Sequence, residues 1–214
     1  MKNRKRLLAI GLLAVLLFTC FTGCAGSKEQ AKKLEGVWVL STEVGESLKQ
    51  TLLESIGMSE VEIPLMEHLS FSYDIFHAFN ADGTFRLAVD TDSMKAGVKQ
   101  FYRDVFDTLY DNIPVLEEAY GISFNGATRE EFWQLYAEAQ DMASYEEMIE
   151  YFAANCFDYT VLSKDISYGS YTVKGKRVIM EDRIGDRSGE VDFTLAGNSL
   201  TLFFGDGPET YIKK

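Results

Sequence analysis

A single histidine, His77, lies where a side chain with hydrogen-bonding or acid–base chemistry would have the most effect. Every second residue around it is apolar or aromatic, so Tyr73 and Phe79 share its side of an expected strand. A polar group inside an apolar cavity fixes the orientation of a bound ligand. The same pattern also fits a histidine that is hydrogen-bonded within a packed core.

Pairs of acidic residues could act as catalytic carboxylates, but in this chain they stand where helices are expected to begin. Glu130-Glu131 and Glu146-Glu147 follow Thr or Ser at capping-box spacing, and negative charge is favourable at a helix start. The segment 90–93, with Asp at positions 90 and 92, lacks the Gly and the distant Glu of an EF-hand loop, so it also indicates a cap. No G-x-S-x-G motif, phosphate-binding Gly loop or close His pair is found. We therefore expect no catalytic residue, no cofactor and no metal site.

The first 23 residues have the composition of an export signal. A basic start is followed by an apolar run over 7–18, which is short for a lasting membrane span. The small residue Gly23 then precedes Cys24. This ending resembles the lipobox of bacterial lipoprotein signal peptides, although Phe21 stands where that family usually has Leu. Cys20, which follows a Thr, is a poorer match to the same pattern.

The resemblance implies that residues 1–23 are removed and that Cys24 carries acyl chains such as palmitate. The protein would then be held on the outer, non-cytoplasmic face of the cell membrane by those chains alone. The alternative is an ordinary cleaved signal peptide without lipid.

Composition limits the partners of the remaining 191 residues, a length that suits one domain, with or without a large insertion. They contain 33 acidic and 17 basic residues, a net charge of −16, which argues against binding to nucleic acid or to anionic headgroups. Cys156, beside apolar neighbours, is the one thiol left after Cys24 and indicates a small core residue. A disulfide within the chain is therefore not expected.

Alternating apolar residues predict eight strands in an antiparallel meander. The fold is expected to begin at residue 34, after a charged tether over 24–33, and a short helix is expected over 47–56. Asn80-Ala81-Asp82-Gly83 joins two alternating runs, which is typical of a hairpin. The expected strands are 36–42, 71–79, 85–89, 168–174, 177–183, 190–196, 200–204 and 210–213.

Between about 92 and 165 the apolar spacing changes to that of amphipathic helices. We expect four helices there, inserted between two strands of the meander. The segment holds 15 acidic and five basic residues. It could cover the barrel mouth, bind a partner or share the core.

An eight-stranded meander tends to close into a barrel, because closure removes unpaired edges. With Gly36-Val37-Trp38 on the first strand and a short helix after it, the chain resembles lipocalin-like (calycin-type) domains over 36–91 and 166–213. The resemblance implies a structural role for Trp38 at one end of the barrel. The predicted fold class is α+β, mainly antiparallel β: an eight-stranded up-and-down lipocalin-like barrel with an inserted acidic helical subdomain.

The side chains expected inside the barrel are the candidate ligand-binding residues, namely Tyr73, His77, Phe85, Leu87 and Phe193. The expected ligand is a small apolar or amphipathic molecule. The alternative is a solid barrel in which the helices of 93–164 bind a protein partner of the cell envelope. A cavity of several hundred cubic ångströms would favour the first hypothesis.

Overall fold

The computed structural model describes residues 27–214. The export signal, Cys20 and the expected lipidation site Cys24 lie outside these residues and stay predictions. Within the described part of the chain, no helix has the length and apolar character needed to cross a membrane.

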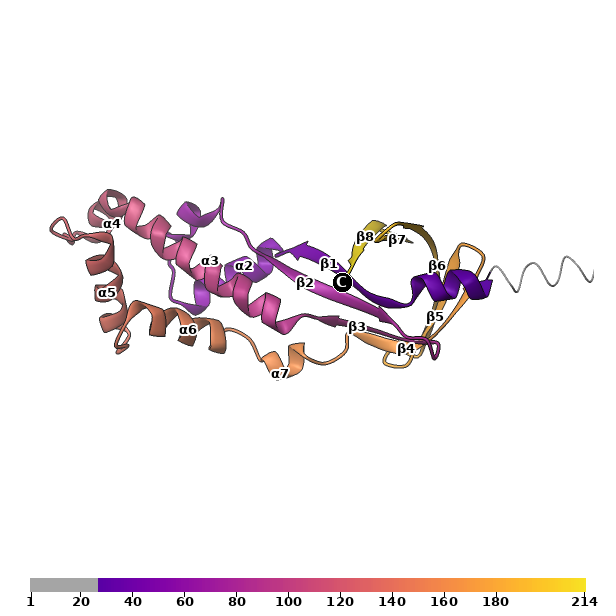
Figure 1. The fold of residues 1–214 in the computed structure, drawn as a ribbon. Helices are drawn as coiled ribbons and strands as arrows, with labels where there is room; N and C mark the ends of the chain where they lie inside the picture. The colour runs from indigo at the N-terminus through magenta and orange to yellow at the C-terminus, as the bar shows by residue number, and fades with distance from the viewer. Residues whose placement is uncertain (1–26) are drawn as a thin grey trace, which may run out of the picture. The chain divides into compact units, whose positions relative to one another are not determined.

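Eight antiparallel strands form a closed barrel in the order β1 to β8, as the sequence predicted (Figure 1). Strand β8 closes the barrel against β1, where Trp38 lies opposite Lys213 and Val39 opposite Ile212. This up-and-down order is consistent with a lipocalin-like fold of the α+β class. The strands are β1 (Gly36–Glu43), β2 (Ser72–Phe79), β3 (Thr84–Val89), β4 (Ser167–Lys174), β5 (Arg177–Asp182), β6 (Arg187–Ala196), β7 (Ser199–Phe204) and β8 (Gly207–Lys213).

The turn between β2 and β3 shows why the hairpin forms where the sequence predicted it. The backbone N–H of Asn80 donates to the Thr84 carbonyl at 2.8 Å, and that of Gly83 donates to the Asn80 carbonyl at 3.0 Å. The Asp82 carboxylate accepts from the Thr84 hydroxyl at 2.6 Å and from its N–H at 2.9 Å. Local hydrogen bonds of this kind set the register of the two strands.

The chain divides into two compact units, and the boundary falls within β1 and β2. The barrel unit comprises the described residues up to Leu40, together with Phe76–Ala88 and Asp165–Lys214. The helical unit comprises Ser41–Ile75 and Val89–Lys164. It is larger than the insertion predicted at about 92–165, because it also includes the segment after β1 and the first half of β2.

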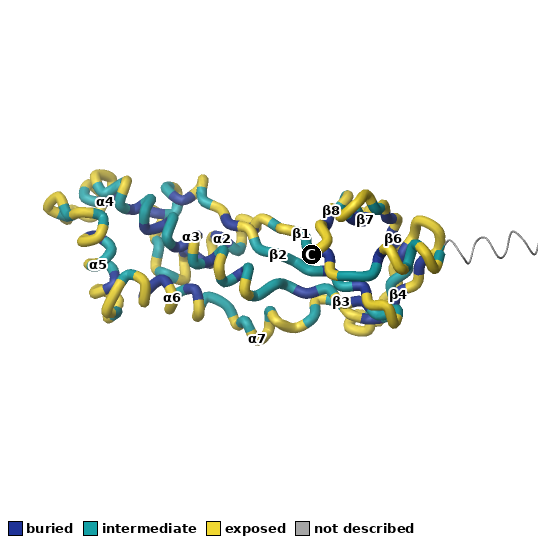
Figure 2. The backbone as a smooth tube through the Cα atoms, in the orientation of Figure 1, coloured by how far each residue is buried: buried dark blue, intermediate teal, exposed yellow. Residues whose placement is uncertain are grey.

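The barrel unit has its own apolar core, drawn dark blue in Figure 2. Residues 27–33, part of the tether expected over 24–33, form a helix together with residue 34. Leu34 of this helix is fully buried in the barrel core, and Ala31 packs against it. The other buried members of the core are Trp38, Phe79, Phe85, Tyr171, Val173, Val178, Val191, Phe193, Leu200, Leu202 and Tyr211.

Trp38 has the contacts of a structural residue. Its indole N–H donates to the Leu34 carbonyl at 2.7 Å, and its ring is 1% exposed. The Lys213 ammonium lies 5.1 Å from the ring centroid and donates to the Glu35 carbonyl. Gly36 has a φ of +129°, and a Cβ at this position would lie 2.8 Å from Lys213 Cε. The Gly-x-Trp motif therefore joins the N-terminal helix to the last strand.

The helical unit contains the five helices that the sequence predicted, four of them within about 92–165 and one near 47–56, and two further helices. Asp90 caps the helix that follows it, and Thr128 forms a capping box with Glu131, so the cap interpretation of these acidic residues is confirmed. The short helix expected over 47–56 begins one residue earlier, at Glu46, and follows Gly45 without a side-chain cap. The helices are α2 (Glu46–Ser55), η1 (Ile63–Met66, a 3₁₀ helix), α3 (Thr91–Asp111), α4 (Ile113–Tyr120), α5 (Arg129–Ala139), α6 (Tyr145–Asn155) and α7 (Tyr159–Leu162), of which η1 and α7 were not predicted.

Helix α3 is the centre of a second apolar core. Its predicted stripe is buried and packs against other helices, and α6 lies beside it (Figure 1). Ion pairs of Lys99 with Glu150 and of Arg103 with Glu146 connect the two helices. Cys156 is half-buried against the same core, and burial raises the pKa of its thiol. This is the environment of a packed thiol rather than a reactive one.

Candidate functional site

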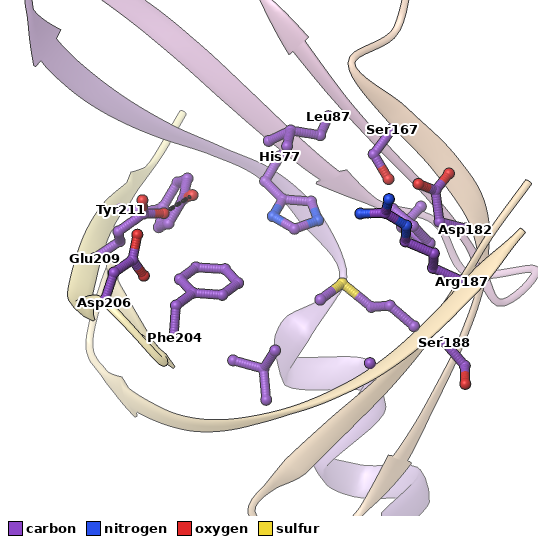
Figure 3. Close-up of a pocket in the computed structure, with 14 residues that line it drawn as sticks. His77, Leu87, Ser167, Asp182, Arg187, Ser188, Phe204, Asp206, Glu209 and Tyr211 are labelled. Atoms are coloured by element: carbon purple, nitrogen blue, oxygen red, sulfur yellow. Dashed lines mark hydrogen bonds between the residues drawn. The ribbon is translucent and has the colours of Figure 1, made fainter. Parts of the chain in front are cut away.

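A cavity of about 610 Å³ lies within the barrel unit and is lined by residues from seven strands, β2 to β8 (Figure 3). Alternate strands of a meander finish at the same end of the barrel. Leu87, Asp182 and Phe204, near the ends of β3, β5 and β7, therefore meet at one end, and all three line the cavity. The opposite end, where β1 begins, is filled by side chains that include Leu34 and Trp38. The barrel is thus packed at one end and hollow at the other.

His77 on β2 is the central polar group of this cavity. It is 2% exposed, and its ring stacks on Phe79 with a centroid distance of 4.3 Å. Neither ring nitrogen has a hydrogen-bond partner among the described residues. Burial lowers its pKa to about 4, so the ring is neutral near pH 7. A neutral imidazole offers one N–H donor and one acceptor, and no described residue uses either of them.

The remaining wall is largely apolar. Phe85 and Tyr211 flank His77, with ring centroids 5.8 and 6.0 Å from it. Figure 3 shows the His77 and Phe204 rings directed into the same space. The other apolar side chains of the lining are Leu87, Met180 and Val191. An apolar wall with a small number of convergent polar groups is typical of a small-molecule site.

Four charged side chains also line the cavity. Asp182 on β5 faces Arg187 on β6 in the strand ladder, whereas Asp206 and Glu209 come from the β7–β8 hairpin. The Tyr211 hydroxyl donates to Glu209 Oε2 at 2.6 Å. Burial and this hydrogen bond raise the pKa of Tyr211, so the hydroxyl stays a donor.

The structure brings three of the five candidate ligand-binding residues together. His77, Phe85 and Leu87 line the cavity. Phe193 is buried in the barrel core at 3% exposure, but it is absent from the lining. Tyr73 does not lie in the barrel interior, because it packs against the core of the helical unit. The expected position of Tyr73 is therefore wrong, and Phe71, at the start of the same expected strand, also packs in the helical core.

Sequence reasoning missed the charged residues of the cavity. Asp182 and Arg187 flank a loose connection, and Asp206 lies within a turn. Asp182 shares the side of Met180 on β5, and Arg187 shares that of Val191 on β6, so the period of two extends to both charged residues. Asp206 follows no such period. The available signals were this alternation at the strand ends and the position of the turns at the same end of an up-and-down barrel.

The described residues show no arrangement suited to metal chemistry. Within 27–214, no group of three or more His, Cys, Asp and Glu side chains is placed to hold a metal ion. His68, the second histidine, is exposed and is not part of the cavity.

In comparisons with known proteins, no family model matches this chain and no curated protein matches its sequence. The functional argument therefore depends on the fold and on the cavity.

Proposed function

We propose that this protein is a lipid-anchored lipoprotein of the cell surface whose barrel binds a small apolar or amphipathic molecule. The main support for the binding function is the position of His77. This buried side chain lines a cavity of about 610 Å³, and neither of its ring nitrogens has a partner among the described residues. An unpaired buried polar group costs roughly 1–3 kcal/mol, which a ligand able to hydrogen-bond with His77 would offset. The proposal includes no chemical step.

The volume of the cavity agrees with this proposal. Pockets for drug-sized ligands measure about 300–1,000 Å³, so the barrel has room for one such molecule. The anchoring part of the proposal is supported by the sequence of residues 1–24 and by the absence, within 27–214, of a helix that could span a membrane.

Native mass spectrometry tests the binding function directly. A chain that starts at residue 24 and carries Cys24→Ser keeps every described residue and has no acyl chain of its own. We expect it to retain a small molecule that is released on unfolding. A His77→Phe variant, in which an apolar ring replaces the imidazole, should retain much less of it. Equal retention by both proteins would contradict the proposed site.

The helical unit supports a second candidate function, the binding of a protein partner in the cell envelope. Leu135 on α5 is 50% exposed and lines a surface hollow with Phe124, Glu130, Glu131 and Glu138. Exposed apolar surface beside charged groups is common at protein interfaces. A photo-crosslinking residue at position 135 should then capture one specific envelope protein in cells, whereas the same residue at Glu181 in the barrel unit should not.

A further inference from the structure

The charged groups of the cavity indicate the class of ligand. We propose, on the basis of the binding function above, that the barrel takes a cationic amphipath. Its cationic group, such as an ammonium, would lie near Asp206 and Glu209. Its apolar part would lie against the side chains around Phe85 and Phe204, which line the same cavity.

Negative groups outnumber positive ones at the cavity. Three carboxylates, from Asp182, Asp206 and Glu209, line it together with one guanidinium, from Arg187. From residue 24 onward, the barrel unit as a whole contains 11 acidic and 11 basic residues. The excess of negative charge is therefore a local property of the cavity. Such an excess attracts cations and repels carboxylates and phosphates.

The single cation, Arg187, already has a carboxylate opposite it. Asp182 is its partner in the β5–β6 ladder. The Asp182 carboxylate and the Arg187 side chain both approach Gly185, at 3.3 and 3.4 Å from the position that a Cβ would take there. The two charges thus offset each other on one wall. Asp206 and Glu209 lie on the other wall. The β7–β8 ladder places no basic lining residue opposite either of them.

Glu209 is positioned to receive a ligand. Tyr211 is 2% exposed, and its hydroxyl donates a hydrogen bond to Oε2 of Glu209. No described residue donates a hydrogen bond to Oε1. In Figure 3, Glu209 and Tyr211 lie on one side of His77, while Asp182 and Arg187 lie on the other. A fixed carboxylate beside an aromatic ring is a favourable site for an ammonium group.

His77 suits the same ligand. Because its ring is buried and neutral, it does not repel a cation, and its unprotonated nitrogen can accept a hydrogen bond from an ammonium or hydroxyl group. Two partly exposed carboxylates together should give a preference of about tenfold for a cation over a neutral molecule.

Three probes with the same ten-carbon chain test this proposal: decylammonium, 1-decanol and decanoate. We would titrate each into the chain that starts at residue 24 with Cys24→Ser, at pH 7.5 and below the concentration at which the probe aggregates. Decylammonium should bind about tenfold more tightly than decanol, and decanoate should bind most weakly. Added salt should weaken the binding of decylammonium and leave that of decanol unchanged.

Matched variants test which carboxylates cause the preference for decylammonium over decanol. Asp206→Asn and Glu209→Gln should each weaken decylammonium binding severalfold while preserving decanol binding. The control is Glu181→Gln, since Glu181 lies on β5 beside Asp182 but is exposed and absent from the lining. It should change the binding of none of the probes. Thermal melting confirms that each variant is folded.

Two results would overturn the proposal: decanoate binding as tightly as decylammonium, or a cation preference that survives both cavity variants. If none of the three probes binds the unmodified chain, the proposed binding function itself fails. A cation preference that is lost only with Asp206→Asn or Glu209→Gln supports the proposal.

Discussion

The unpartnered ring nitrogens of His77 should lower the stability of the chain without ligand. The side chain is buried and neutral, and no described residue is hydrogen-bonded to its ring nitrogens. His77→Phe keeps an aromatic ring at the position and removes the two unpaired polar atoms. We expect this variant to be more stable than the unmodified chain by about 1–3 kcal/mol without ligand, and to bind ligand less tightly. Denaturant unfolding at pH 7.5 measures the change. A large loss of stability would instead show that the imidazole is held by the fold.

The same residue makes stability depend on pH. Its pKa falls from 6.5 to about 4 on folding, because burial disfavours the charged form. Above pH 6.5 the ring is neutral in both the folded and the unfolded chain, so it adds no pH dependence. As the pH falls from 6.5 towards 4, the unfolded chain binds a proton that the folded chain does not, and the free energy of unfolding decreases. The loss amounts to about 3 kcal/mol over that range.

Unfolding measured from pH 7.5 to 4 in the unmodified chain and in His77→Phe isolates this effect, since changes at carboxyl groups are common to both. The difference between the two proteins should widen as the pH falls. His68→Gln, a change at an exposed position, serves as the control and should follow the unmodified chain. If the difference in unfolding free energy between His77→Phe and the unmodified chain does not change with pH, His77 has the same pKa in the folded and unfolded states.

We predict that acyl chains on Cys24 attach the protein to the membrane. If this cysteine is the acylated residue, Cys24→Ser in the full-length chain should block processing or release the protein from membranes. Cys20→Ser should change little, because a Thr rather than a Gly precedes it. Detergent phase partitioning of both variants is the measurement. Equal membrane retention of the Cys24 variant would contradict the proposed lipid attachment.

At the level of elements, the β4–β5 pair depends on a close approach at Gly169. A Cβ at this position would lie 1.8 Å from the Glu181 carbonyl oxygen, which is backbone and cannot rotate away. Gly169→Ala should therefore force the two strands apart and cost more than about 2 kcal/mol. Gly189→Ala on β6 is the matched control, because nothing lies within 4 Å of its added Cβ. Thermal unfolding of the two variants should differ clearly, and similar midpoints would show that the strands can move.

The strands themselves could be predicted because each has one apolar side and a turn with distinctive residues. Period two states which side of a strand a residue is on, but not how far along the barrel it lies. Tyr73 and His77 share a side of β2, yet Tyr73 packs with the helical core while His77 lines the cavity. Asp206, one of the charged residues of the cavity, could not be predicted, for another reason. The direction of a side chain such as Asp206 is set by the turn conformation and not by a repeating pattern.

At the level of the whole molecule, charge is divided between the two units. From residue 24 onward the barrel unit is neutral, whereas the helical unit has 22 acidic and 6 basic residues, a net charge of −16. The entire net negative charge of residues 24–214 thus belongs to the helical unit. This charge should repel anionic headgroups, and a basic surface would complement it on any partner that the unit binds.

The two units also have separate cores, so damage to one core should leave the other largely protected. Phe101 on α3 is fully buried in the helical core, together with Leu52, Leu53 and Phe71, which lie outside the predicted insertion. Phe101→Ala should destabilise the helical unit by about 3–5 kcal/mol. In native-state hydrogen exchange, amides of 41–75 and 89–164 should then exchange faster, while those of β4 to β7 keep their protection.

Leu202→Ala in the barrel core is the reciprocal variant, because Leu202 is also fully buried. It should accelerate exchange in β4 to β7 and leave α3 and α6 protected. If either variant lowers the protection of both units equally, the chain unfolds as one cooperative body in spite of its two cores. A selective loss would mean that the helical unit can rearrange, for example on binding a partner, while the barrel cavity around His77 remains intact.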